Sequence, residues 1–221
     1  MAATRTGRLH RFQGAWSAEE WYPCGWIMSG TSVGTALVVV DVQNDFADPE
    51  GSLFVRGAGK VVKVVNGLVE RARSEGWTVF YTQDWHPETT PHFAKDGGIW
   101  PVHCVGGSRG AEFHPDLMVE GVSVKKGGAG EDGYSGFTMR DLVKGKDRPT
   151  ELHSLLQERN IARVVVVGLA LDYCVKDTAL DAVRLGYQVE VPLDATAAVN
   201  LSPDDGDKSI AALRAAGVSV S

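Results

Sequence analysis

Cysteine is scarce in this chain, which has only Cys24, Cys104 and Cys174 among its 221 residues. An odd and sparse set speaks against a disulfide scaffold and favours a reducing compartment, so we predict a cytoplasmic protein. Long apolar runs are also lacking, since none approaches the roughly 20 residues that span a bilayer. Positive charge is not in excess either, because the net charge is −6 and no basic stripe is visible. Neither a membrane nor a nucleic acid is therefore an expected partner.

The chain is long enough for one domain with a sizeable core, since 43% of its residues are hydrophobic. Short β-branched runs alternate with amphipathic stretches from residue 34 onward, which favours a parallel sheet with helices on both faces. We therefore predict an α/β fold, a single three-layer α/β/α domain with a mostly parallel sheet, over residues 34–221. The predicted strands include 36–41, 77–82, 122–126, 164–167, 188–191 and 218–220. The predicted helices are 61–73, one capped by Thr150, one ending near 185 and one starting at 202.

The first 33 residues fit this pattern poorly. They hold half of the chain's six tryptophans without a helix or strand period, and they show no signal-peptide pattern. We expect an N-terminal extension that is either disordered or a mis-assigned start, with Met28 as the native first residue. The alternative is a genuine extension that docks its tryptophans on the surface or at a subunit interface.

The segment 168–176, Gly-Leu-Ala-Leu-Asp-Tyr-Cys-Val-Lys, follows a buried strand pattern and opens an amphipathic helix. Cys174 is therefore expected near a helix N-terminus, where unpaired N–H groups and the helix dipole favour an anion. This position predicts a lowered thiol pKa and a reactive thiolate. A small buried cysteine that packs the helix against the sheet is an alternative of equal weight.

Charged residues end two further predicted strands. Asp41 follows the apolar run 36–40, and the run 122–126 ends in Lys125 and Lys126 before a glycine-rich stretch. Functional groups gather at the carboxyl ends of parallel strands, so we expect Asp41, one lysine and Cys174 to meet there. Only one lysine can enter, because adjacent strand residues point to opposite faces. The ammonium would stabilise the thiolate and the carboxylate would move the proton.

A pattern of metal ligands follows the run 77–82. Asp84 and His86, two apart on an extended segment, face the same side, and His92 and His103 follow in a loop-rich stretch. Oxygen and imidazole ligands suit zinc, iron(II) or manganese, so one divalent metal ion is the expected cofactor. A lone loop histidine is usually solvated surface, but four candidate ligands beside a candidate nucleophile favour a site.

Two long loops are expected in this chain, 87–116 and the glycine-rich 127–136. Loops of this length in a compact domain are often functional, so we expect them to carry the metal site and a lid. Cys104 lies in the first loop beside a candidate ligand, and we expect it to be a packing residue.

Several short motifs occur in a fixed order between residues 35 and 200. They are 40–46 (VDVQNDF), 51–53 (GSL), 82–87 (TQDWHP), 100–105 (WPVHCV), 110–115 (GAEFHP), 126–127 (KG), 134–137 (YSGF) and 168–175 (GLALDYCV). With these motifs the chain resembles the isochorismatase-like cysteine hydrolases, and within them the nicotinamidase branch. Several motifs in one order are more specific than any single one.

The resemblance implies a catalytic triad of Asp41, Lys126 and Cys174, with Lys126 preferred to Lys125 because it directly precedes glycine. It also implies an oxyanion hole made by the backbone N–H groups of Ala170 and Cys174, beside a cis peptide bond that precedes Ala170.

The resemblance further implies Asp84, His86 and His103 as metal ligands, with His92 as an additional ligand that only some members have. Aromatic residues are implied to line the substrate pocket, namely Phe46, Trp100 and Tyr134. Leu171 and Gly136 stand where threonine and alanine are common in the family, which puts the shape of the pocket in doubt and leaves the chemistry intact.

The expected activity is that of a metal-dependent nicotinamidase, which hydrolyses nicotinamide to nicotinate and ammonia through a cysteine thioester in NAD salvage. Pyrazinamide is an expected second substrate, and self-association into a homo-oligomer is compatible with the sequence. One alternative is another amidase of the same fold, acting on a ureido or different carboxamide substrate. The other is a non-catalytic metal-binding member.

Overall fold

The computed structural model describes residues 33–128, 131–141 and 144–221. The expected N-terminal extension and the expected start at Met28 lie outside these residues. Among the residues that are described, no helix combines the length and the apolar character needed to cross a bilayer.

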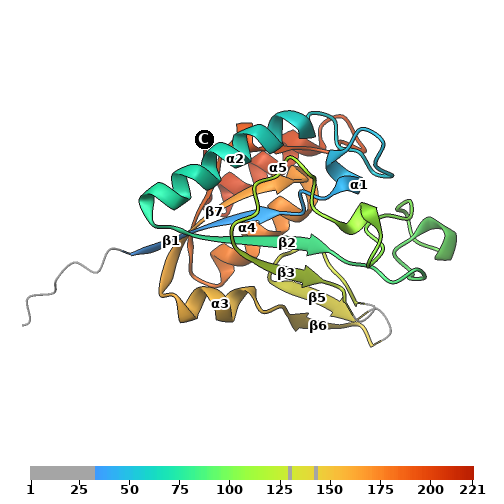
Figure 1. The fold of residues 1–221 in the computed structure, drawn as a ribbon. Coiled ribbons are helices and arrows are strands. Elements are labelled where there is room, and N and C mark those ends of the chain that lie inside the picture. The colour runs from blue at the N-terminus through green and yellow to red at the C-terminus, as the bar shows by residue number, and fades with distance from the viewer. Residues whose placement is uncertain (1–32, 129–130, 142–143) are drawn as a thin grey trace, which may run out of the picture. The chain divides into compact units, whose positions relative to one another are not determined.

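A central sheet of seven parallel strands organises the domain (Figure 1), and its members are β1 (Gly34–Val40), β2 (Thr78–Asp84), β3 (Val122–Lys126), β7 (Ile161–Leu169), β8 (Gln188–Val191), β9 (Thr196–Ala197) and β10 (Ser219–Val220). The strand order is β10-β8-β7-β1-β2-β3, with β9 paired to β7. Strands β1 and β7, which carry the longest apolar runs, lie next to each other in the middle of the sheet because both of their faces are covered.

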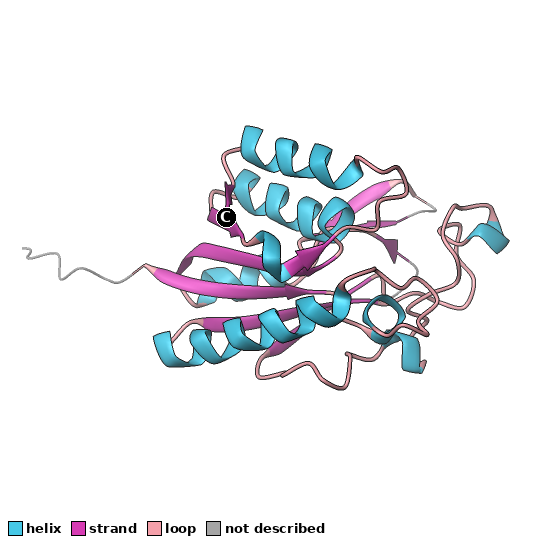
Figure 2. Cartoon of the chain, turned by 90° about the horizontal axis from the view of Figure 1, so that it is seen from above, coloured by secondary structure: helices cyan, strands magenta, loops and turns pink. Residues whose placement is uncertain are grey.

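Helices cover both faces of this sheet (Figure 2), which confirms the predicted three-layer α/β/α fold. Helix α2 (Ala58–Glu75) packs on one face, and α3 (Leu152–Glu158), α4 (Lys176–Arg184) and α5 (Asp205–Ala215) pack on the other. Alternate side chains of β1 serve the two cores: Leu37 and Val39 join the α2 side, whereas Val38 and Val40 join the opposite side.

The predicted helices correspond to observed ones. The stretch 61–73 lies within α2, and the segment predicted to end near 185 ends at Arg184 in α4. The N-cap of α3 is Glu151 and not the predicted Thr150; the Thr150 hydroxyl, one residue earlier, accepts a hydrogen bond from the Leu152 N–H at 3.2 Å. Helix α5 begins at Asp205, three residues after the predicted start.

The prediction of a lid loop over 127–136 is wrong in part, because this segment leads into a second sheet. Three antiparallel strands form it: β4 (Glu131–Asp132), β5 (Thr138–Asp141) and β6 (Lys146–Pro149). Charged and polar residues make up most of these strands, so neither an apolar run nor a clean alternation marks them in the sequence. The ladder of backbone hydrogen bonds holds the strands, together with an ion pair of 3.2 Å between Arg148 and Glu131.

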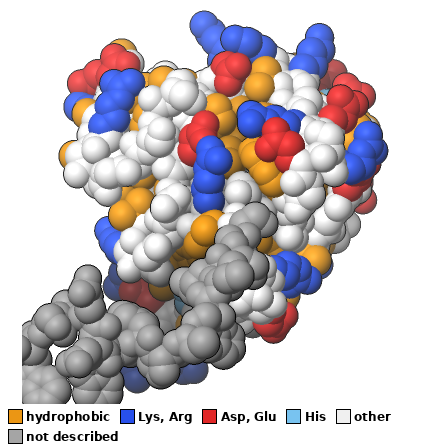
Figure 3. Space-filling view, turned by 90° about the vertical axis from the view of Figure 1, so that its left-hand side faces the viewer, with side chains coloured by type: hydrophobic (Ala, Val, Ile, Leu, Met, Phe, Trp, Pro, Cys, Tyr) orange, Lys and Arg blue, Asp and Glu red, His pale blue; other side chains and the backbone are white. Residues whose placement is uncertain are grey.

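The long connection from β2 to β3 is loop-rich, as predicted. It leaves the carboxyl end of β2 and returns to the amino end of β3, because the two strands are parallel. It contains the short 3-10 turns η1 (Ala94–Asp96) and η2 (Arg109–Ala111). Two isolated β-bridges, His86 with Val105 and Phe93 with Trp100, pair backbone segments within this connection. Basic, acidic and hydrophobic side chains are mixed on the visible part of the opposite face, at the amino ends of the strands (Figure 3).

Candidate active site and metal centre

The carboxyl ends of β1, β3 and β7 bring Asp41, Lys126 and Cys174 together. The Lys126 ammonium lies 2.5 Å from Asp41 Oδ2 and 3.4 Å from Cys174 Sγ. All three side chains are buried. Lys125 points the other way, and its ammonium lies 3.6 Å from the centre of the Trp85 ring. The fold therefore places Lys126, and not Lys125, beside the cysteine.

The chain reaches Cys174 through a tight turn after β7. Gly168 has a φ of +108°, and a Cβ at this position would lie 2.2 Å from the Val40 carbonyl oxygen, so only glycine fits. The peptide bond between Leu169 and Ala170 is cis, as the resemblance implies. A single π-helical turn, Leu171–Val175, then carries the cysteine into α4. Cys174 thus lies at the predicted junction of strand and helix.

The predicted lowering of the Cys174 thiol pKa is wrong. Burial raises this pKa well above its usual value; the Lys126 ammonium opposes the shift, and the Asp41 and Asp84 carboxylates add to it. Removal of the thiolate from water disfavours its charged form, and this effect outweighs the attraction of the Lys126 ammonium. The thiol therefore keeps its proton until a base removes it.

Asp41 lies where such a base is needed. Burial raises the pKa of Asp41, and this effect outweighs the nearby ammonium of Lys126. The Thr82 hydroxyl donates to Asp41 Oδ1 at 2.6 Å, while Lys126 holds Oδ2. A carboxylate with a raised pKa accepts a proton at neutral pH more readily than an exposed one.

Lys126 supplies a fixed positive charge. Burial alone lowers the pKa of Lys126, but Asp41, Cys174 and Asp84 together raise it well above its usual value. The ammonium also donates to the Tyr134 carbonyl oxygen at 3.0 Å, which fixes its position between the carboxylate and the sulfur.

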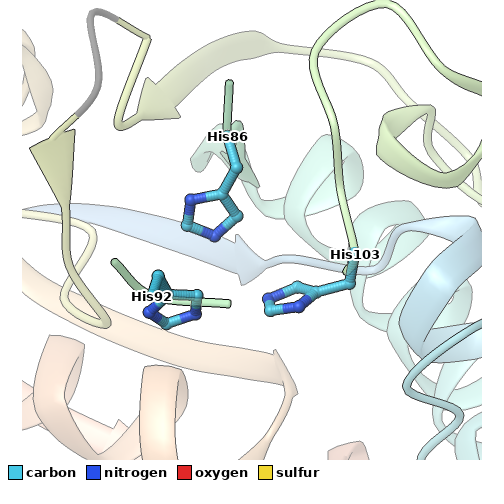
Figure 4. Close-up of side chains that lie close together, drawn as sticks. All are labelled: His86, His92 and His103. Atoms are coloured by element: carbon cyan, nitrogen blue, oxygen red, sulfur yellow. The ribbon is translucent and has the colours of Figure 1, made fainter. Parts of the chain in front are cut away.

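Three histidines converge next to this cluster (Figure 4). His86, His92 and His103 are buried, and each offers a ring nitrogen within 4.8 Å of those of the other two. Asp84 Oδ2 lies 3.3 Å from His86 Nε2 and 3.5 Å from His103 Nε2. Asp84 Oδ1 lies 3.8 Å from Lys126 Nζ. The Asp84 carboxylate thus lies between the histidines and Lys126, and so joins the metal-ligand cluster to the cysteine cluster.

The state of His86 shows whether these residues suit a metal ion. Both of its ring nitrogens are buried, and neither makes a hydrogen bond within the described part of the chain. Buried polar atoms without a partner are costly, and a cation would satisfy one of these nitrogens. Three imidazoles and a carboxylate are ligands that suit zinc, iron or manganese, so the residues fit a divalent ion. Cys104 packs in the core with its sulfur 3.9 Å from the Gly110 carbonyl oxygen, as expected for a packing residue.

A cavity opens beside Cys174, and the empty space within it, including its open mouth, is about 350 Å³. The Trp100 indole N–H donates to the Tyr134 hydroxyl at 2.9 Å, which locks two aromatic walls together. The lining residues include the three predicted aromatics, both predicted oxyanion residues and three of the four predicted metal ligands, namely Phe46, Trp100, Tyr134, Ala170, Cys174, Asp84, His92 and His103.

Comparison with known proteins identifies the family. The Isochorismatase domain family matches residues 35–221 of the chain. The chain belongs to the isochorismatase family. This confirms the resemblance and the fold class predicted from the sequence.

Relatives of this family member are similar over most of their length. The nicotinamidase of Escherichia coli is 36% identical over 203 residues, which cover 84% of this chain and 93% of the relative. The pyrazinamidase of Pyrococcus horikoshii, solved in complex with zinc, has a TM-score of 0.75 at 34% identity and covers 85% of this chain and 98% of its own. PnC1 from L. infantum, solved in complex with nicotinate, has a TM-score of 0.76 at 36% identity, with coverages of 86% and 93%.

Sequence reasoning missed several residues of this site. Leu53, Tyr173 and Val199 also line the cavity; Leu53 and Tyr173 lie within the motifs 51–53 and 168–175, whereas Val199 lies in none of them. The Tyr173 ring lies edge-on to Trp100 at 4.9 Å between centroids. Thr82 opens the motif 82–87, but nothing in the sequence indicates that its hydroxyl faces the Asp41 carboxylate.

Proposed function

We propose that this protein is a metal-dependent nicotinamidase, which hydrolyses nicotinamide to nicotinate and ammonia. The observation that carries the proposal is the buried contact of Cys174, Lys126 and Asp41 at the floor of an aromatic cavity with histidines in its wall. The E. coli relative is named a nicotinamidase, and the L. infantum relative was solved with nicotinate, the product of this reaction.

The first step activates the nucleophile. Asp41 takes the proton from the Cys174 thiol, and the resulting thiolate forms an ion pair with the Lys126 ammonium. The raised pKa of Asp41 suits a group that must accept a proton and later return it. Lys126 keeps its charge throughout, since its own pKa is held high.

The thiolate then attacks the carboxamide carbon. The carbonyl oxygen becomes an oxyanion, and we assign its stabilisation to the backbone N–H groups of Ala170 and Cys174. Asp41 gives its proton to the departing nitrogen, ammonia leaves, and a thioester remains on Cys174. Asp41 next takes a proton from water, and the hydroxide adds to the thioester. Collapse expels the Cys174 thiolate, Asp41 returns its proton to the sulfur, and the carboxylic acid formed loses its proton to solvent as nicotinate.

The wall of the cavity would orient the substrate. Asp84, His86, His92 and His103 would hold the divalent ion, which when bound supplies a Lewis-acidic site for the ring nitrogen of the substrate. Phe46, Trp100 and Tyr134 present aromatic surface that favours a flat ring. Pyrazinamide has the same shape and a nitrogen at the same place, so we propose it as a second substrate.

Two further parts of the proposal concern the protein as a whole. We propose residues 34–221 as the catalytic domain, because the described residues of both hydrophobic cores lie within them. We also propose that the protein acts in the cytoplasm, in NAD salvage, where a reduced Cys174 is maintained.

Ammonia release tests the proposal directly. Purified wild type and Cys174→Ala are each assayed with nicotinamide, before and after chelation of metal and after adding metal back. We expect release only from metal-loaded wild type. Activity that survives chelation would remove the metal from the scheme, and full activity of Cys174→Ala would contradict the thioester. No release from metal-loaded wild type would favour the alternative amidases, which other carboxamides and ureido compounds would then reveal.

A further inference from the structure

The three histidines differ in what holds their rings. The Nδ1 atom of His103 lies 2.7 Å from the Pro101 carbonyl oxygen. The Nδ1 atom of His92 lies 2.8 Å from a carboxylate, Asp132 Oδ2. The nitrogens of His86 have no hydrogen-bond partner among the described residues. Of the three rings, His92 thus has the only anionic partner other than the shared carboxylate of Asp84.

Asp132 is itself held in place. Its second oxygen, Oδ1, accepts the N–H of Gly133 at 2.7 Å, so both carboxylate oxygens are engaged. The residue belongs to β4, where it pairs with Arg140 of β5. The side chain of His92 is 5% exposed and that of Asp132 is 21% exposed, so the contact is largely shielded from water. A carboxylate fixed on both oxygens sets the rotation of the ring that it contacts.

We propose that Asp132 is a positioning residue that orients His92 toward the metal ion, an inference that rests on the metal site of the proposed function. A carboxylate at Nδ1 keeps the proton on that nitrogen and leaves the lone pair on Nε2 for the ion. The carboxylate also makes the imidazole a stronger electron-pair donor to the metal ion than a carbonyl partner at Nδ1 would. His92 thereby becomes a firm fourth ligand to a site otherwise built from Asp84, His86 and His103.

The contact also gives a role to the small antiparallel sheet. The ligands Asp84, His86, His92 and His103 all lie in β2 or in the connection that follows it, whereas Asp132 comes from β4. The Asp132 contact therefore joins the second sheet to the metal site. The alternative is that the contact only holds the hairpin of β4 and β5 in place. The experiment therefore has to distinguish this structural role from the positioning of His92.

Zinc affinity measured without substrate makes this separation. Metal-free protein is titrated with Zn²⁺ in competition with a chromogenic chelator, for wild type, Asp132→Asn and Asp132→Ala. We expect about 10-fold weaker binding for the isosteric Asp132→Asn, and up to about 100-fold weaker binding for Asp132→Ala. Asp147→Asn is the matched control, because it removes an exposed carboxylate from β6 of the same sheet, and it should bind as wild type does.

A double-mutant cycle shows whether Asp132 acts through His92. In the His92→Ala background, adding Asp132→Asn should cause no further loss of Zn²⁺ affinity. The absorption spectrum of the Co²⁺ protein gives a second signature, which should move toward that of His92→Ala in Asp132→Asn and stay unchanged in Asp147→Asn.

Each contrary outcome has a distinct meaning. If wild type binds Zn²⁺ tightly and the Kd of Asp132→Asn for Zn²⁺ lies within twofold of the wild-type value, the inference is overturned. The proposed function is then unaffected. The inference is also overturned if Asp132→Asn weakens Zn²⁺ binding as much in the His92→Ala background as in wild type, because Asp132 would then act without His92. Wild type that binds no Zn²⁺ would overturn the metal part of the proposed function and the inference with it.

Discussion

At the scale of single residues, the site depends on charges that are buried together. Asp41 and Lys126 are fully excluded from solvent, and each is the nearest opposite charge of the other. Such a pair adds little to stability as a whole, but removing one partner leaves the other uncompensated. The side chains that form the site are therefore also required for the fold around it.

Lys126→Met should unfold more easily and lose activity. The substitution leaves Asp41 buried without its counter-charge, so we expect a loss of about 3–5 kcal/mol in the free energy of unfolding, measured with urea. Lys125→Met is the matched control, because the Lys125 side chain is exposed and its ammonium lies over the Trp85 ring. Its loss should be about 0.5–1 kcal/mol with ammonia release retained. Equal effects of the two substitutions would contradict the assignment of Lys126.

Thr82→Val should move the acidic limb of the pH profile of kcat/KM to higher pH. The Thr82 hydroxyl donates to the charged form of Asp41 and so lowers its pKa. Removing this donor raises the pKa, and at a given acidic pH a smaller fraction of Asp41 is then ionised and able to accept the thiol proton. Thr78→Val, at the other end of the same strand, should leave the limb where it is. A shift in the opposite direction would argue against Asp41 as the base.

At the scale of elements, the sequence predicts those parts whose own residues carry a period. The apolar runs of β1 and β7 and the amphipathic stripe of α2 are of this kind, because burial on defined faces dictates which residues they hold. Strands β4 to β6 carry no such period, since their stability comes from backbone pairing and ion pairs. Asp132 was missed for this reason: the hairpin that brings it to His92 leaves no mark in its sequence.

The same distinction holds within the site. Asp41, Lys126 and Cys174 are recognisable because each ends a strand or opens a helix, where the fold places reactive groups. The thiol pKa was mispredicted because position along the chain gives no measure of burial or of neighbouring carboxylates. The pKa of a side chain depends on its burial and on the neighbouring charges in the folded structure, so it has to be determined from that structure.

Gly168→Ala tests the turn that links β7 to the cysteine. An alanine there meets the Val40 carbonyl at 2.2 Å as well as an unfavourable φ, so the backbone of β1 or β7 must shift. Gly186→Ala is the control, since Gly186 has a φ of +91° but no atom within 4 Å of the added Cβ. We expect Gly186→Ala to cost about 1 kcal/mol and to keep activity. Gly168→Ala should cost about 2 kcal/mol more and lose activity; similar losses in both would show that the close approach is unimportant.

At the scale of the whole molecule, metal binding should stabilise the fold. An ion that binds only the folded state adds about 4 kcal/mol when its free concentration is a thousand times the Kd. For a chain of this size that corresponds to roughly 8–16 °C in Tm. Chelation should lower the Tm by this amount, and added Zn²⁺ should restore it. His86→Ala should abolish the response, whereas Cys174→Ala should retain it; a Tm that ignores metal in wild type would contradict the site.

The three residues of the cysteine cluster are far apart along the chain. Asp41 and Lys126 are separated by 85 residues, and Lys126 and Cys174 by 48. They meet only after the four adjacent strands β7, β1, β2 and β3 have paired, and these long-range contacts form slowly. Recovery of ammonia release during refolding therefore reports completion of the sheet. A partly folded chain that has formed only its helices and local turns should show none.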